Sequence, residues 1–75
     1  MSKGEIKTTR LHQKLRALRK KATLTLRELG QKADLSISYL SDIERGRTTP
    51  SLETCQKLAS VYLMDLGALF KNIVI

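Results

Sequence analysis

One short segment, residues 36–45, carries side chains with the chemistry to contact a nucleic acid. Projected as a helix, it turns two apolar residues to one side, and its opposite side carries Ser38, Ser41, Asp42 and Arg45. Ile37 at the N-terminal edge can contact a thymine methyl, and Asp42 can accept from a cytosine amino group. Arg45 can bind a phosphate or a guanine. These residue types are also common on solvated helix faces. The choice between a binding surface and an ordinary solvated surface therefore depends on the neighbouring elements.

Other chemistries lack the residues that they need. With one cysteine, Cys55, and one histidine, His12, the chain cannot form a disulfide framework or an ordinary zinc site. It has no glycine-rich phosphate loop and no paired-carboxylate motif. We expect Cys55 to be a packed thiol and His12 to lie at the surface. The sequence therefore predicts no enzyme, no cofactor, no metal and no small-molecule ligand.

The positive charge is concentrated in the first third of the chain. The 75 residues carry a net charge of +7. Residues 1–27 hold nine basic side chains and one acidic one, whereas residues 28–75 hold five basic and six acidic ones. An excess of this kind favours a polyanionic partner, either nucleic acid or an anionic membrane surface.

No segment has the pattern of a targeting signal or a membrane span. Charges occur throughout the first thirty residues, and no stretch approaches the roughly 20 apolar residues that a bilayer requires. The length suits a single domain. We expect a cytoplasmic protein in a reducing compartment.

Apolar spacing and capping residues predict the first two helices. Leu residues at 11, 15 and 18 form one stripe, which predicts a helix over residues 8–21. Thr25 and Glu28 have the spacing of a capping box, which starts a second helix. That helix should end near Asp34, a residue type that tolerates a left-handed conformation.

Three further helices follow at short intervals. Ser36 caps a third helix that spans Ser36 to Arg45 and ends at Gly46, and so tight a turn between two short helices indicates a helix-turn-helix. Ser51, after Pro50, caps a fourth helix. Its predicted buried side consists of Leu52, Cys55, Leu58, Ala59 and Tyr62. Asp65 caps a short fifth helix through residue 70.

Together these residues resemble the Cro/C1-type helix-turn-helix (XRE) family, over about residues 10–70. The resemblance is carried by Leu18-Arg19, Thr25-x-x-Glu28-Leu29, Ser36-x-x-Tyr39-Leu40-x-x-Ile43-Glu44-Arg45-Gly46 and Pro50-Ser51-Leu52-Glu53. Residues 38–59 are most similar to DdrO-like DNA-damage-response repressors and also to SinR-type regulators. The resemblance implies an all-α, compact five-helix lambda-repressor-like DNA-binding domain in a bacterium or phage. It would occupy residues 8–70, between a flexible arm, 1–7, and an apolar tail, 71–75.

The resemblance also implies roles for individual residues. The helix at 36–45 would enter the major groove, with base contacts from Ile37, Ser38, Ser41 and Asp42. Phosphates would be held around two amide-rich helix starts and on the helix between them, by Thr25, Leu26, Arg27, Tyr39, Arg45, Arg47, Thr48 and Thr49. For Tyr39, packing is an equal alternative. Arg19 and Glu44 match the positions of an ion pair in the family.

Some residues depart from the family pattern. Leu26 stands where the family often has Gln, so a contact to phosphate and base is lost there. Thr23 and Leu63 replace glycines that commonly follow the first and fourth helices, so either the caps differ or strain is tolerated.

The function implied is repression, or regulation, of transcription by a homodimer on a double-stranded, pseudo-palindromic operator. The predicted dimer contact is formed by Leu66, Leu69, Phe70, Ile73, Val74 and Ile75. The apolar tail can instead be the point where a longer protein continues. Alternative functions are an antitoxin or restriction-modification controller of the same fold, or a basic module that binds a protein or membrane surface. Membrane binding is disfavoured, because the leucine stripe of the first helix is needed for the core.

Overall fold

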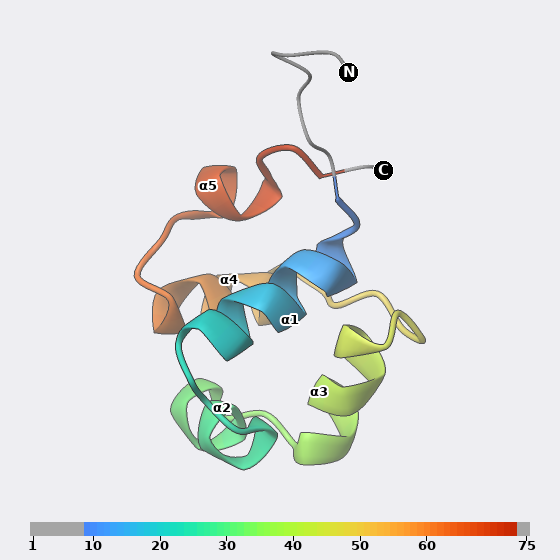
Figure 1. Cartoon of the computed structure of the whole chain (residues 1–75), viewed down its shortest axis with the longest axis vertical. Coiled ribbons are helices and arrows are strands. Elements are labelled where there is room, and N and C mark those ends of the chain that lie inside the picture. Colours follow the sequence, from blue (N-terminus) through green and yellow to red (C-terminus); the bar gives the residue numbers. More distant parts are fainter. Residues whose placement is uncertain (1–8, 74–75) are drawn as a thin grey trace.

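The computed structural model describes residues 9–73 and consists of five helices (Figure 1). They are α1 (Leu11–Lys21), α2 (Leu26–Ala33), α3 (Ile37–Glu44), α4 (Leu52–Val61) and α5 (Leu66–Phe70). α2 and α3 form the helix-turn-helix at one end of the molecule, and α5 lies at the other end (Figure 1). The predicted arm, 1–7, and the last two residues of the predicted tail lie outside the described range.

α1 begins three residues later than predicted, so the start at residue 8 was wrong. Arg10 is extended and forms the N-cap, and its backbone N–H donates to the Gln13 side chain at 3.1 Å. The N–H of Thr9 donates to the carbonyl of Asn72 at 3.0 Å, and Thr9 forms an isolated parallel bridge with Ile73. Pairing with the C-terminal segment therefore keeps this residue out of the helix.

The caps of α2 and α3 are as predicted. The Thr25 hydroxyl accepts from the N–H of Glu28 at 3.1 Å, and the Glu28 carboxylate accepts from the N–H of Thr25 at 2.8 Å. Asp34 ends α2 in a left-handed conformation with φ of 58°. Ser36 then caps α3 through the N–H of Tyr39. Local side-chain chemistry thus fixes the turn between the two helices.

Backbone strain is tolerated at the two positions where this chain lacks the glycine that is common in the family. Thr23 and Leu63 adopt the left-handed conformation, with φ of 58° and 57°. Leu63 is 93% exposed, so its side chain gains little from packing there. The backbone path therefore overrides the preference of these residues.

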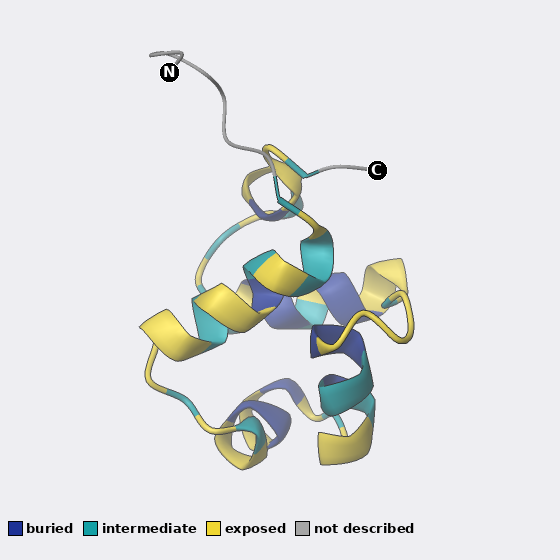
Figure 2. Ribbon diagram, turned by 45° about the vertical axis from the view of Figure 1, so that its right-hand side comes forward, coloured by how far each residue is buried: buried dark blue, intermediate teal, exposed yellow. Residues whose placement is uncertain are grey.

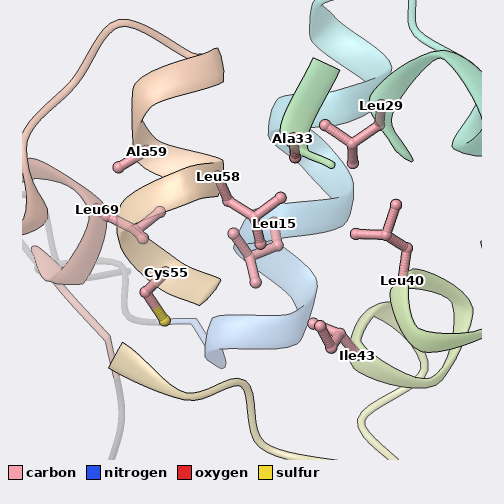
Figure 3. Packing of buried hydrophobic residues seen from close by; sticks show 9 residues of the cluster. All are labelled: Leu15, Leu29, Ala33, Leu40, Ile43, Cys55, Leu58, Ala59 and Leu69. Atoms are coloured by element: carbon pink, nitrogen blue, oxygen red, sulfur yellow. The ribbon is translucent and has the colours of Figure 1, made fainter. Parts of the chain in front are cut away.

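All five helices contribute to one apolar core. Leu15 of α1 and Leu58 of α4 lie at its centre (Figure 3), and each is at most 2% exposed. Buried residues around them are Leu29, Ala33, Leu40, Ile43, Cys55, Ala59 and Leu69. Burying one such leucine contributes about 1.5–3 kcal/mol. Cys55 is a packed thiol as predicted, and its burial raises its pKa.

Three residues lie differently from their predicted places. Leu52, the first residue of α4, is 60% exposed, not buried, and the buried residues of that helix begin at Thr54. His12 is half-buried rather than at the surface, because its ring lies against Gly46. Leu69 is fully buried in the monomer core, so it was wrongly predicted as a dimer contact.

A lysine holds α5 to the rest of the domain. The Lys14 ammonium of α1 donates to the carbonyl oxygens of Ala68 at 2.7 Å and Lys71 at 3.1 Å. It thereby satisfies carbonyls at the C-terminal end of a helix that has only five residues. Sequence reasoning missed this contact, because the partners are more than fifty residues apart.

We predict that Leu63→Gly stabilises the protein by about 0.5–1 kcal/mol, since glycine removes the left-handed penalty and no buried contact is lost. Leu63→Ala is the matched control, because alanine keeps the Cβ atom that causes the penalty. The free energy of unfolding in urea measures both variants. Equal free energies of unfolding for Leu63→Gly and Leu63→Ala would contradict the proposal that the backbone at residue 63 is strained.

Candidate nucleic-acid interface

One face of α3 is open to solvent while the other is buried. Leu40 and Ile43 are at most 1% exposed and form the inner side. Ile37 is 43% exposed, Ser38 and Arg45 are exposed, and Ser41 and Asp42 are partly so. Exposure is greatest at the N-terminal end of α3 and in the loop beyond its C-terminal end (Figure 2). The structure thus gathers on one surface the four residues predicted to contact bases.

The loop after α3 folds back onto this face. The N–H of Arg47 donates to the backbone carbonyl of Asp42 at 2.9 Å, and their side chains form an ion pair at 3.9 Å. Both side chains remain about half exposed or more, and exposed pairs of this kind contribute at most about 1 kcal/mol. The Asp42 carboxylate can therefore exchange this partner for another donor.

Two helix starts flank α3 and offer backbone donors. In α2, Glu28 occupies the N–H of Thr25, so that predicted donor is not free. Within the described residues, the N–H groups of Leu26 and Arg27 form no hydrogen bond. The hydrogen bonds from Thr25 lower the pKa of Glu28. Thr48 and Thr49 are exposed in the loop that leads to the second helix start, at Ser51.

Tyr39 packs inward, which favours the packing alternative. Its hydroxyl lies 3.1 Å from the hydroxyl of Thr54, which is 6% exposed and also accepts from the Ser51 hydroxyl at 3.0 Å. The ring packs against the apolar core. Leu26 also packs against the core, so only its backbone is suited to hold a phosphate. Sequence reasoning missed the Thr54 contact, although its spacing from Ser51 is that of a cap.

A buried ion pair joins the C-terminal end of α3 to α1. The Arg19 Nε donates to both carboxylate oxygens of Glu44, at 3.0 and 2.9 Å, and its Nη1 donates to the carbonyl of Leu24 at 2.8 Å. The side chains are 14% and 7% exposed. The hydrogen bond with Glu44 raises the pKa of Arg19. The structure thus contains the pair that the family resemblance implied.

Tyr62 of the α4 C-cap lies in the same electrostatic environment. Burial, and secondarily the charge of Glu44, raise the pKa of Tyr62 to about 12. Its buried hydroxyl has no hydrogen-bond partner among the described residues. Burial and the nearby charge of Glu44 therefore keep the Tyr62 phenol neutral beside the ion pair.

In the described range, no helix is both long and apolar enough to cross a membrane. Residues 9–73 also contain no group of three or more residues suited to hold a metal ion.

Comparison with known proteins identifies similar chains. A family model described as HTH_3, helix-turn-helix, matches residues 15–69. The HTH-type transcriptional regulator DdrOP3 of Deinococcus deserti is 45% identical over 64 residues, which cover 85% of this chain and 50% of that protein. This chain therefore spans half the length of that relative.

Solved structures show the same fold. A crystal structure of SinR, the master regulator for biofilm formation, in complex with DNA is 34% identical, with a TM-score of 0.75 over 81% of this chain and 98% of that one. The P22 c2 repressor in complex with a synthetic operator is 28% identical, with a TM-score of 0.77 over 87% and 98%. The predicted five-helix, lambda-repressor-like fold is confirmed.

We predict that breaking the buried ion pair on one side costs about 3–5 kcal/mol, because the remaining charge is left without a partner. Arg19→Met and Glu44→Leu should each reach this range, and the double variant should lose much less than their sum. Asp42→Asn, in the exposed pair, is the control and should lose less than about 1 kcal/mol. Urea unfolding measures all four, and additive losses would contradict the coupling.

Proposed function

Because the chain belongs to the HTH_3 helix-turn-helix family, we propose that it is a sequence-specific DNA-binding transcriptional regulator that acts as a repressor. One observation carries the proposal: the exposed face of α3 combines polar side chains with one apolar residue, Ile37, and lies between two helix starts with backbone donors. The name of the Deinococcus relative and the DNA in the SinR and P22 c2 structures support it. We place its action on DNA in the cytoplasm, and binding alone requires no catalytic group.

The proposed base contacts come from the open face of α3. Ile37 would contact a thymine methyl, and the hydroxyls of Ser38 and Ser41 would hydrogen-bond to base edges. Asp42 would accept from a cytosine amino group after releasing Arg47. Because these side chains are short, the helix backbone would lie deep in the major groove.

The proposed phosphate contacts surround that face. The free N–H groups of Leu26 and Arg27 stand at the positive end of the α2 dipole. Further donors would be the side chains of Arg27, Arg45, Arg47, Thr48 and Thr49, all of which are exposed. Tyr39 would support α3 from behind and would not hold a phosphate, because its hydroxyl points inward and pairs with Thr54.

We also assign a homodimer to the active form. One short helix reads only a few base pairs, and two copies on an inverted repeat would add their contacts, with half-sites one helical turn apart. Phe70 is exposed, and Leu66 and Ile73 are partly buried. Leu66 and Phe70 belong to α5, which lies at the end of the molecule opposite the helix-turn-helix (Figure 1). Val74 and Ile75 lie outside the described residues.

We predict that Ser38→Ala and Asp42→Ala relax discrimination at particular base pairs, by about 1–3 kcal/mol at each. Arg27→Ala should weaken binding to all sequences alike and lower the salt slope by about 1. Affinities for single-base variants of a preferred operator at fixed salt measure both effects. Lys32→Ala, an exposed charge in the last turn of α2, is the control. Equal losses for all variants on all sequences would contradict these roles.

We predict that Phe70→Ser weakens dimer formation about tenfold or more, since aromatic residues dominate such contacts. Leu52→Ser is matched to it, because Leu52 is an exposed apolar residue on a different helix. Sedimentation at tens of micromolar measures the association. A wild-type protein that remains monomeric with and without operator would contradict the dimer.

A further inference from the structure

A small cleft lies where α1, α2 and α3 meet beside the recognition face. It has a volume of about 180 Å³ and is lined by Arg16, Arg19, Leu26, Ser41, Glu44 and Arg45. One water molecule occupies about 30 Å³ of liquid, so the cleft has room for a tetrahedral oxyanion. Its polar lining comes from two helices that are joined by the buried ion pair.

The charges in this cleft do not balance. Arg19 and Glu44 neutralise each other. The guanidinium groups of Arg16 and Arg45 form no ion pair and no hydrogen bond with any side chain in the described part of the chain. Two positive charges therefore face a shared space that has no free carboxylate. Such a space favours an anion, and guanidinium groups bind phosphate oxygens in a directed manner.

The position of the cleft indicates which anion fits. Ser41, a proposed base contact, lies in its wall, and Leu26 belongs to the first turn of α2, whose N–H groups are free. A DNA strand at the edge of the groove that α3 enters would pass the cleft mouth. On its other side, Arg16 borders a shallow depression of α1 that is also lined by Gln13, Ala17 and Lys20. Lys20 adds another positive charge there.

We infer that Arg16 and Arg45 together hold one backbone phosphate of the operator in this cleft, so that α1 contributes directly to DNA binding. The inference rests on the proposed function and adds Arg16, which neither the sequence pattern nor the helix-turn-helix itself singles out. A phosphate held from both α1 and α3 would fix the angle at which α3 enters the groove. The base contacts of Ser41 would depend on that angle.

The test combines protein and DNA variants. Each operator duplex in the series carries one neutral methylphosphonate linkage, placed at a different position. The affinity of every duplex is measured for the wild type, Arg16→Gln, Arg45→Gln and Lys57→Gln. Lys57 is the matched control, because it loses the same charge but lines a separate groove between α2 and α4. Circular dichroism melting verifies that all variants are folded.

Neutral linkages should weaken wild-type binding at each contacted phosphate, and we expect one such position per half-site, with a loss of about tenfold, to depend on Arg16 and Arg45; tenfold is the scale of one charge-assisted hydrogen bond. That effect should shrink in Arg16→Gln and in Arg45→Gln, because each variant leaves one arginine on the phosphate, and it should persist unchanged in Lys57→Gln. The salt slope of Arg16→Gln should fall by less than about 0.9, the value for one whole phosphate, because Arg45 remains. If Arg16→Gln matches Lys57→Gln on every duplex, the cleft assignment is wrong although the operator is bound. A wild type with no preferred operator overturns the proposed function and this inference together.

Discussion

The position of α3 depends on the ion pair between Arg19 and Glu44. A helix of eight residues is too short to be stable alone, so tertiary contacts must hold it. Arg19 donates at once to the end of α3 and to the carbonyl of Leu24 between α1 and α2. One guanidinium therefore connects α1, the segment between α1 and α2, and the end of α3. A buried pair adds little net stability, but its geometry selects a single arrangement, because any other leaves a charge unpaired.

A second set of contacts holds α3 from its other neighbours. The Tyr39 hydroxyl joins the buried Thr54 and, through it, the cap of α4. At the C-terminal end, the His12 ring lies against Gly46, where an added Cβ would be 3.1 Å from the ring. Gly46 has φ of 76°, so two separate reasons favour glycine there. α3 is thus fixed from behind and at its C-terminal end, and one face remains open.

Features set by neighbouring residues could be predicted from the sequence, whereas those set by distant packing could not. The capping box at Thr25 and the left-handed turn at Asp34 are local, and both are present. The late start of α1 and the burial of Leu69 depend on contacts with distant segments. Arg19 and Glu44 are 25 residues apart, so periodicity could not pair them, and the family resemblance supplied the pairing. For the site, the open face of α3 followed from helical projection, but the Arg16 cleft needed three helices in place.

Selection from a random duplex DNA library shows whether the fixed, open face of α3 reads base sequence. The salt is fixed near 150 mM, because nonspecific affinity varies steeply with salt. We expect enrichment of an inverted repeat whose half-sites are one helical turn, roughly 10–10.5 base pairs, apart. No enrichment, with binding that declines uniformly as salt rises, would contradict it and leave a basic domain that binds DNA without reading sequence.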